Sequence, residues 1–379
     1  MCKTRRADQR LLYVEFPRRD ADKIESANMK ILTIIGARPQ FIKAATVSRV
    51  IAKREDVTEI IVHTGQHYDV NMSDIFFEEM DIPKPDYHLG IGGGGHGQMT
   101  GRQLEAIERV LLKEKPDFAL VYGDTNSTLA GTIAAVKLHI PVAHVEAGLR
   151  SFNRQMPEEI NRVLTDHAAA KLLAPTETAM RNLRNEGLPE ERISLVGDVM
   201  YDASLFFRAR AEEPVWFDGL QTSSKGFVLA TVHRAENTDD PVRLRAIIEG
   251  LAASDRPVIL PLHPRTRRRL DAIDINLPAS LKIVDPVGYL QMVWLEKHCS
   301  LIATDSGGIQ KEAYFFNKPC VTLRDETGWV ELVEAGWNTL TGADADRIAF
   351  AIDQAKAPIV SSELYGLGDA AERVLGEIL

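Results

Sequence analysis

Short apolar runs alternate along this chain with longer segments that have helical spacing. Glycine, proline or charged residues bound the runs, which is typical of strands buried on both faces of a parallel sheet. The runs lie at 30–35, 59–63, 118–122, 142–145, 171–174 and 193–196, and then at 227–232, 258–262, 282–284, 301–304 and 320–323. Helical spacing falls between them, for example at 41–54, 101–115 and 127–138. Two successive strand–helix series predict an α/β protein with two Rossmann-like, doubly wound domains facing across a cleft.

The beginning of the chain differs from the rest. The first 28 residues carry seven Lys or Arg and five Asp or Glu, and Met29 then opens the strand-and-turn segment MKILTIIGARPQ. We therefore expect 1–28 to be an extension that is disordered or not native. The N-terminal domain is expected at 29–198 and the C-terminal, nucleotide-binding domain at 199–362. A final segment, 363–379, is expected to end in a helix.

Polar or charged residues follow almost every predicted strand. In doubly wound sheets, ligands bind at the carboxyl ends of the strands. Because so many of these ends are charged, they indicate one binding cleft between the two domains. The stretches are GARPQ at 36–40, HTGQH at 63–67, YGDTN at 122–126, HVEAGLR at 144–150, TVHRAEN at 231–237, LHPR at 262–265 and DSGG at 305–308.

The stretch DSGGIQKE at 305–312 has the pattern of a strand end that turns into a helix. Ser306 can cap the helix, and Gly307 and Gly308 leave backbone N–H groups open to a ligand. A helix N-terminus with such donors binds phosphate. Glu312 follows about one and a half turns later, within reach of sugar hydroxyls. This stretch therefore predicts a diphosphate site.

Further cations are expected around the diphosphate. Arg38 stands in the matching turn of the first domain, where its guanidinium can contact a diphosphate oxygen, and Lys43 follows one helical turn after Pro39. The substrate-binding set also includes Arg150, Arg234 and His263, each in a strand-end stretch of its own.

Acidic side chains stand at the same edge. Asp124 and Glu146 each follow a strand, and Glu158 comes after a loop. A carboxylate at a cleft can act as a general acid or base if burial tunes its pKa. The topology places His233 opposite them, in the second domain. Each residue alone would more simply be a helix cap or a salt-bridge partner, but as a set they favour catalysis.

Composition narrows the alternatives. The chain has 379 residues, 45% hydrophobic and 26% charged, and its net charge of −9 argues against nucleic-acid binding through a basic surface. No apolar run reaches the ~18 residues of a membrane span. The three widely spaced cysteines make neither a disulfide framework nor a zinc motif. We expect a cytosolic protein without metal or cofactor; the GxGxxG-like run at 90–95 does not follow a clear strand, so no nicotinamide site is predicted.

Taken together, the motifs resemble those of a known family. In order from residue 36 to 313 the chain has GARPQFIK, HTGQHYD, YGDTNSTLAG, HVEAGLRSFN with MPEEINR, VHRAEN, HPRT and TDSGGIQKEA. Over 29–342 it resembles the non-hydrolysing UDP-N-acetylglucosamine 2-epimerases. The resemblance implies a GT-B-like architecture, a homodimer and a C-terminal helix that packs back on the N-terminal domain.

The resemblance also implies an isomerase that needs no cofactor and makes precursors of bacterial surface polysaccharides. It would invert C2 of a UDP-2-acetamido sugar to the manno form. UDP leaves C1 while a base removes the C2 proton, which gives a 2-acetamidoglucal. A proton then reaches the opposite face of C2, and UDP adds again.

Matching motif by motif assigns roles to single residues. Asp124, Glu146 and Glu158 match the catalytic carboxylates of the family, and His233 matches its catalytic-site histidine. Which carboxylate is the base and which the acid stays open. The binding residues matched in the same way are Arg38 and Lys43 for the diphosphate clamp, Ser306, Gly307 and Gly308 for the phosphate turn, and Glu312 for the ribose hydroxyls.

Several motifs depart from the common family spelling. GARPQF replaces GTRPEA, the loop from Glu146 to Glu158 is two residues shorter, and ETGWVE at 326–331 replaces an ERPE-type stretch. These spellings are similar to a subgroup that acts on UDP-2,3-diacetamido-2,3-dideoxyglucuronic acid, with Arg154 and Trp329 as candidates for recognising the added groups. The sequence leaves both this sugar and UDP-N-acetylglucosamine open as the substrate.

Two functions of other classes also stay open. A GT-B glycosyltransferase would require a separate acceptor. A nucleotide-sugar binding protein would bind UDP and exchange no proton at C2.

Overall fold

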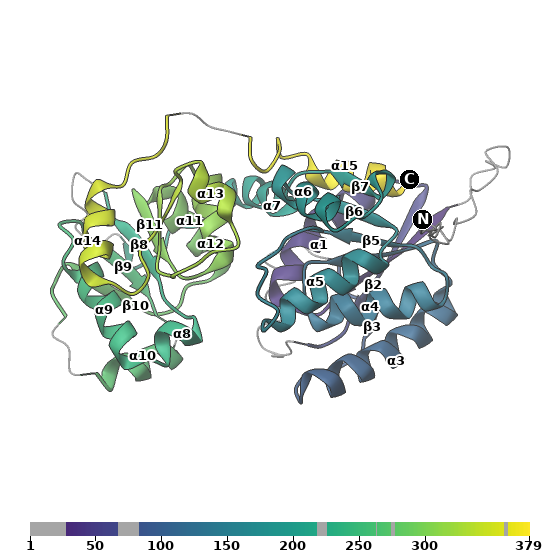
Figure 1. The fold of residues 1–379 in the computed structure, drawn as a ribbon, viewed down its shortest axis with the longest axis horizontal. Coiled ribbons are helices and arrows are strands. Elements are labelled where there is room, and N and C mark those ends of the chain that lie inside the picture. The colour runs from purple at the N-terminus through teal and green to yellow at the C-terminus, as the bar shows by residue number, and fades with distance from the viewer. Residues whose placement is uncertain (1–27, 67–82, 218–225, 263, 274–276, 360–362) are drawn as a thin grey trace, which may run out of the picture.

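The computed structural model of the protein describes residues 28–66, 83–217, 226–262, 264–273, 277–359 and 363–379. The N-terminal extension and His263 therefore lie outside the described residues. The predicted α/β class with two Rossmann-like sheets is confirmed: the strands form a seven-stranded and a six-stranded sheet with parallel pairing (Figure 1). The strand orders are β3-β2-β1-β4-β5-β6-β7 and β10-β9-β8-β11-β12-β13. We call the first sheet with the helices packed on it the first half, and the second sheet with its helices the second half.

The strands match the apolar runs of the sequence. Those of the first sheet are β1 (Met29–Ile35), β2 (Val57–His63), β3 (Tyr87–His88), β4 (Phe118–Tyr122), β5 (Val142–Val145), β6 (Lys171–Ala174) and β7 (Ile193–Leu195). Those of the second sheet are β8 (Val228–Thr231), β9 (Val258–Pro261), β10 (Leu281–Val284), β11 (Leu301–Thr304), β12 (Cys320–Thr322) and β13 (Asn338–Leu340). The sequence analysis missed β3 and β13 because their sequences, Tyr-His and Asn-Thr-Leu, form no apolar run.

Helices connect the strands. Up to the start of the second sheet they are α1 (Arg38–Ile51), α3 (His96–Glu114), α4 (Asn126–Lys137), α5 (Pro157–Ala168), α6 (Glu177–Asn185) and α7 (Val199–Arg208). After it come α8 (Ala235–Thr238), α9 (Pro241–Ala252), α10 (Pro264–Asp271), α11 (Tyr289–His298), α12 (Gly307–Phe315), α13 (Val330–Glu334), α14 (Ala345–Gln354) and α15 (Ala370–Ile378).

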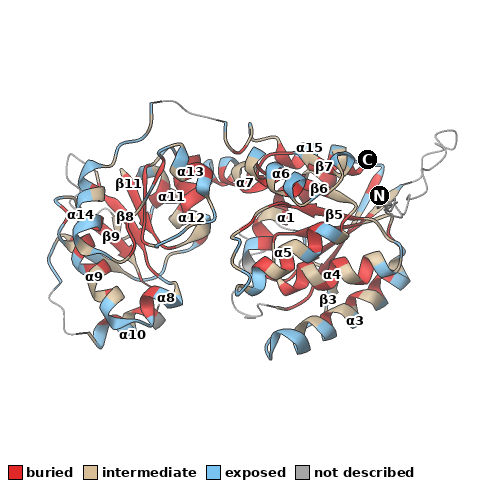
Figure 2. Ribbon diagram, in the orientation of Figure 1, coloured by how far each residue is buried: buried red, intermediate tan, exposed pale blue. Residues whose placement is uncertain are grey.

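Each sheet is covered on both faces. In the first half, α1, α7 and α15 pack on one face and α3, α4 and α6 on the other. In the second half, α9, α10 and α14 cover one face, and α11 and α12 the other. Buried residues are concentrated in the strands between these layers (Figure 2). Burial on both faces explains why the strands are continuous apolar runs and not alternating ones.

The chain leaves the first half after α7 and returns to it before α15, and the segments that precede these two helices touch each other. The N–H of Asp198 donates to the carbonyl of Tyr365 (3.0 Å). Gly197 has φ +85°, and a Cβ there would lie 3.0 Å from that same carbonyl oxygen, so the close approach requires glycine. After this return, α15 packs against α1, α7 and β6 of the first half.

Candidate active site

A cavity of about 440 Å³ lies between the carboxyl edges of the two sheets. We call it the central cavity. It opens where the strand order reverses, beside β1 and β4 in the first half and β11 in the second, which is where doubly wound sheets bind ligands. Its lining residues are Pro39, Lys43, Gly123, Asp124, Glu146, Leu149, Arg150, Ser151, Met156, Arg162, Met200, Arg234, Ser306, Gly307, Gly308, Lys311, Arg324, Glu326, Thr327, Gly328 and Trp329.

The turn after β1 is shaped by a buried glutamine. The N–H groups of Gly36 and Ala37 donate to Gln40 Oε1 at 2.8 and 3.0 Å, and Gln40 Nε2 donates to the carbonyl of Tyr122 (2.8 Å). The first two bonds satisfy donors at the helix start, so α1 begins at Arg38, three residues earlier than the helical spacing predicts. One turn later, Lys43 reaches the central cavity.

Asp124 stands at the end of β4 and is held by an arginine. Arg162 Nε donates to Asp124 Oδ2 at 3.0 Å, and a second guanidinium nitrogen contacts the same oxygen. The third nitrogen donates to Glu159 Oε2 at 2.9 Å. Because Arg162 lies on α5, the helix fixes the Asp124 carboxylate at the cavity wall. The Asp124 side chain is still 32% exposed, so a ligand can reach it.

Glu146 follows β5 in an unusual backbone conformation. Its φ is +72°, a left-handed value that a non-glycine residue adopts at a cost of order 1 kcal/mol. Its carboxylate contacts Lys43 Nζ through Oε2 and Lys311 Nζ through Oε1, the latter at 3.2 Å. Burial alone would raise the pKa of Glu146, but the two lysines outweigh it and lower the pKa to about 2. The carboxylate is therefore ionised.

The second half presents a helix N-terminus to the same cavity. Ser306 caps α12: its Oγ accepts from the N–H of Ile309 (3.5 Å), and its own N–H donates to Thr304 Oγ1 (2.9 Å). A Cβ on Gly307 would lie 3.4 Å from Trp329 Nε1, so the glycine leaves the backbone open toward the cavity. This geometry is suited to an anion.

A buried aspartate positions the loop after β8. Asp305, which is fully buried, accepts from the N–H groups of His233 (3.1 Å) and Arg234 (3.0 Å) and from Asn237 Nδ2 (3.1 Å). His233 Nδ1 lies 3.3 Å from the same carboxylate, while the His233 side chain is 51% exposed. Asp305 thus places Arg234 on the cavity wall and His233 beside it.

The structure brings most of the predicted site residues together. Those that line the central cavity are Lys43, Asp124, Glu146, Arg150, Arg234, Ser306, Gly307 and Gly308. Glu158, His233 and Glu312 do not line it: Glu158 is exposed on the first turn of α5, and Glu312 is buried in α12. Arg38 is the first residue of α1, and its side chain lies outside the described part of the structure. His263 lies outside the described residues.

Arg150 has a set of partners that the sequence did not suggest. Its Nε donates to Glu186 Oε1 (2.7 Å), and a terminal nitrogen lies 2.7 Å from Asp166 Oδ2. Asp166 also bonds His144 Nδ1 (2.6 Å). With a side chain only 1% exposed, Arg150 serves this buried network at the base of the cavity.

The sequence analysis missed Arg162, Lys311 and Arg324 as cavity residues, whereas Trp329, which it named as a candidate for sugar recognition, lines the cavity. Arg162 and Lys311 could have been found, because each lies four residues beyond a residue that was assigned, on the same face of a helix. Arg324 donates to Glu236 Oε1 (2.9 Å), and Trp329 packs its ring 4.3 Å from Lys311 Nζ. These two stand in loops, where spacing gives no direction.

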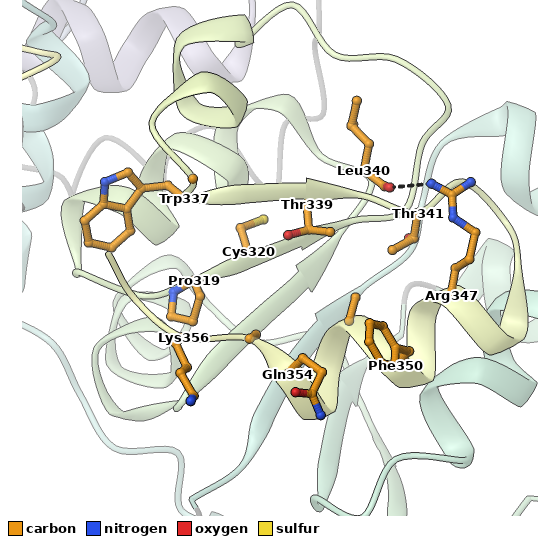
Figure 3. Close-up of a pocket in the computed structure, with 13 residues that line it drawn as sticks. Pro319, Cys320, Trp337, Thr339, Leu340, Thr341, Arg347, Phe350, Gln354 and Lys356 are labelled. Atoms are coloured by element: carbon orange, nitrogen blue, oxygen red, sulfur yellow. Dashed lines mark hydrogen bonds between the residues drawn. The ribbon is translucent and has the colours of Figure 1, made fainter. Parts of the chain in front are cut away.

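A second cavity of about 420 Å³ lies on the flank of the second half, between β12, β13 and α14 (Figure 3). Its lining includes Cys320, Trp337, Arg347 and Phe350, and Arg347 donates to the carbonyl of Leu340 (2.8 Å). We call it the outer cavity. No predicted site residue lines it.

The described residues also bear on metal binding and on membrane insertion. Within the described ranges, no group of three or more His, Cys, Asp or Glu side chains is placed to hold a metal ion. Among the described helices, none combines the length and the apolar character that crossing a bilayer requires.

Comparison with known proteins agrees with the geometry. The family model of UDP-N-acetylglucosamine 2-epimerase matches residues 49–379. The chain is 58% identical over 353 residues to the UDP-2,3-diacetamido-2,3-dideoxy-D-glucuronate 2-epimerase of Pseudomonas aeruginosa, which covers 91% of this chain and 98% of that protein. It is 47% identical over 337 residues to the UDP-N-acetylglucosamine 2-epimerase of Methanocaldococcus jannaschii, with 86% and 92% covered.

Solved structures show the same architecture. The crystal structure of the M. jannaschii enzyme in complex with UDP-GlcNAc and UDP superimposes with a TM-score of 0.81 at 45% identity and covers 92% of this chain and 99% of that one. The Neisseria meningitidis enzyme bound to UDP-GlcNAc gives 0.83 at 31% identity, with the same coverage. The GT-B-like arrangement is thereby confirmed. The chain belongs to the UDP-N-acetylglucosamine 2-epimerase family and is an isomerase of the UDP-sugar 2-epimerase class.

Proposed function

We propose that this chain inverts C2 of a UDP-2-acetamido sugar, with UDP-N-acetylglucosamine as the first substrate to test. One observation carries the proposal: the central cavity places strand-end carboxylates of the first half opposite the N-terminus of α12 in the second half. One wall suits proton transfer and the other suits a diphosphate. Both functions are needed if UDP leaves and returns while C2 loses and regains a proton.

The diphosphate would be bound at the N-terminus of α12. Backbone N–H groups around Ser306, Gly307 and Gly308 supply donors there, and Arg234 supplies a positive charge from the neighbouring loop. Lys43 would contribute from the first half, together with Arg38. Among the described residues, six Lys or Arg and three Asp or Glu line the cavity, so the charge of this lining favours an anion. The nine are Lys43, Arg150, Arg162, Arg234, Lys311 and Arg324, with Asp124, Glu146 and Glu326.

The sugar would lie between the diphosphate and the carboxylates. C2 is not adjacent to a carbonyl, so its proton becomes removable only as the C1–oxygen bond to UDP breaks. A base on one face of the ring and an acid on the other would then complete the inversion. We assign these tasks to Asp124, Glu146, Glu158 and His233 as a set. Glu158 and His233 do not line the cavity and would join the site when the halves approach around a ligand.

Proton NMR of the UDP-sugar in D2O tests the proposal. Epimerisation predicts that deuterium enters C2 with no acceptor present and that the manno epimer accumulates while UDP-sugar persists. A glycosyltransferase would consume the UDP-sugar only after an acceptor is added and would exchange no proton at C2, and a binding protein would neither consume the sugar nor exchange its proton. Release of free sugar with UDP as the final products would indicate hydrolysis.

A second substrate is favoured by a specific observation. The relative with 58% identity carries a name for action on a 2,3-diacetamido-glucuronate. That sugar adds a carboxylate and an acetamide, and Arg324 and Trp329 stand on the cavity wall where they could contact them; Arg154 is exposed in the shortened loop. Side-by-side assays of the two UDP-sugars would decide: a kcat/KM ratio far from one identifies the substrate.

The compartment, the oligomeric state and the domain division of the protein are also proposals. Cys299 and Cys320 are buried free thiols, which supports a reducing, cytosolic compartment. We further propose a homodimer and a division into domains at 29–198 and 199–362, with 363–379 returning to the first domain. Light scattering at several protein concentrations tests the oligomeric state.

A further inference from the structure

Lys311 is a buried cation for which the proposed chemistry has no assigned task. It lies on α12, one turn beyond the phosphate turn, yet its amine does not stay in the second half. Nζ contacts Asp198 Oδ2 and lies 3.2 Å from Glu146 Oε1, and both carboxylates belong to the other side of the central cavity. The exposed fractions are 3% for Lys311, 7% for Glu146 and 1% for Asp198.

The surroundings of Lys311 fix its direction. The Trp329 ring lies 4.3 Å from Nζ and the Tyr365 ring 6.0 Å from it, so aromatic faces cover the amine. Asp198 is itself held, because its other oxygen accepts from the N–H of Met200 (2.8 Å) at the start of α7. Lys311 therefore has one firm anchor and one partner, Glu146, that lines the cavity.

The four charged groups form a row: Lys43, Glu146, Lys311 and Asp198. Two cations and two anions balance, which makes their burial tolerable, but buried ion pairs are generally no better for stability than apolar packing. Because the buried ion pairs bring the fold no clear gain in stability, we attribute their presence to the chemistry of the central cavity. Of the two carboxylates in the row, Glu146 lines the central cavity and Asp198 does not.

A bound diphosphate would change the row. Lys43 faces the cavity and is part of the proposed diphosphate clamp, so the substrate would compete with Glu146 for it. Lys311 is anchored by Asp198, so it would keep its contact with Glu146 Oε1. It would then be the cation that holds this carboxylate while the sugar reacts.

We propose that Lys311 is a positioning residue for the epimerisation, which aligns the Glu146 carboxylate from across the central cavity. The inference rests on the proposed function. It makes the alignment of a first-half carboxylate depend on the second half, so the reacting geometry exists only when the two halves are in contact. Misplacement of a reacting group by about 1 Å can cost on the order of 100-fold in rate.

Lys311→Met tests the inference, since it keeps the length of the side chain and removes the charge. Three quantities are measured: the rate of deuterium entry at C2, the Kd for UDP by calorimetry and the melting temperature. We expect kcat to fall by about 100-fold or more while the Kd for UDP changes by less than about threefold. Lys311→Arg should recover much of the rate. Lys53→Met, at an exposed lysine beyond α1, is the matched control and should behave as wild type.

Three outcomes would overturn the inference. One is a Lys311→Met enzyme with kcat within about threefold of wild type. The second is a loss of rate matched by an equal loss of UDP affinity, which would make Lys311 a ligand contact. The third is failure of Lys311→Arg to recover any rate. If the wild-type enzyme exchanges no deuterium at C2, the proposed epimerisation itself is contradicted, and not the role of Lys311.

A second variant covers the case in which Lys311→Met does not fold. Asp198→Asn keeps the volume and the bond to the Met200 N–H but weakens the anchor of Lys311. We expect kcat to fall by about tenfold with the Kd for UDP unchanged. Unchanged kcat in this variant would contradict the positioning role.

Discussion

The central and outer cavities are nearly equal in volume, about 440 and 420 Å³, yet their walls differ in kind. The central cavity takes acidic and basic side chains from both halves. The described lining of the outer cavity comes from the second half alone, and within it the charged residues are Arg347 and Lys356. Arg347 contacts the Leu340 carbonyl, which ties β13 to α14 (Figure 3).

The positions of the cavities explain the difference. At the carboxyl edge of a parallel sheet, loops are free to carry charged side chains and helices begin with unpaired N–H groups. On the flank of β12 and β13, by contrast, side chains serve to pack α14 on the sheet. Cavity size therefore does not identify a site; convergent charge and open backbone donors do. The comparison predicts that substitutions around the central cavity change turnover and that those around the outer one do not.

The largest effect is expected for Asp124→Asn. The variant keeps the shape of the side chain and can still accept from Arg162, but it cannot take up or carry a proton as a carboxylate does. We expect kcat to fall by about 10²–10⁴-fold, measured as deuterium entry at C2. The Kd for UDP and the melting temperature should stay close to wild type. A kcat within about threefold of wild type would remove Asp124 from the catalytic set.

Glu146→Gln should affect stability as well as turnover. It leaves Lys43 and Lys311 without their shared carboxylate, and removing one partner of a buried pair costs about 3–5 kcal/mol. Urea denaturation followed by circular dichroism would measure the loss. In a Lys311→Met background the same change should cost less, because one uncompensated cation is gone. Additive losses would argue against an energetic link between Glu146 and Lys311.

The Glu146 carboxylate also makes the stability of the fold depend on pH. The folded pKa of Glu146 is about 2, below the ordinary value of 4.5, so the stabilisation is complete above pH 4.5 and is lost as the pH falls toward 2. Wild type should therefore lose stability more steeply over that range than Glu146→Gln does. Equal slopes for the two proteins would contradict the lowered pKa.

A smaller effect is expected at the phosphate turn. Gly307→Ala places a methyl group where the backbone faces the cavity, 3.4 Å from Trp329 Nε1, and the backbone itself is not strained. UDP affinity should fall by about tenfold, or ~1.4 kcal/mol, with the melting temperature unchanged or slightly raised. Calorimetric titration with UDP checks this. Unchanged affinity would place the diphosphate elsewhere.

The smallest effect is expected in the outer cavity. Phe350 is 70% exposed, so Phe350→Ser should alter stability by no more than about 0.5 kcal/mol and leave kcat and KM as in wild type. Steady-state kinetics would show this. A change in KM for the UDP-sugar would mean that the two cavities are coupled, and the contrast between them would then fail.

Much of the architecture could be predicted because it depends on local pattern. Buried parallel strands such as β4, β5, β6 and β11 appear in the sequence as apolar runs with the observed bounds. Strand ends indicated where the central cavity lies. Helical spacing is visible only from residue 41, whereas α1 begins at Arg38, because the Gln40 side chain accepts from the N–H groups of Gly36 and Ala37 and no periodicity records such bonds.

Directions of long side chains could not be predicted. Arg150 and Arg234 both follow strands and both line the central cavity, but the Arg150 side chain is bound to Asp166 and Glu186, whereas Arg234 is positioned through its backbone N–H by Asp305. Helical spacing can place Lys311 on the same face of α12 as Gly307, but it cannot predict the ion pairs of Lys311, because Glu146 and Asp198 lie more than 100 residues away in the chain. Contacts of this kind form only when the two halves meet, so a linear pattern does not contain them.

The last helix, α15, completes the layer that α1 and α7 begin, although a whole sheet separates it from them in the chain. In topological terms, the second half is an insert within the first. Shortening the protein at its C-terminal end would thus weaken the sheet made from its N-terminal end. An affinity tag or fusion partner joined to the C-terminal end would disturb the packing of α15 on α1 and α7. Surface loops of the second half offer a safer attachment point.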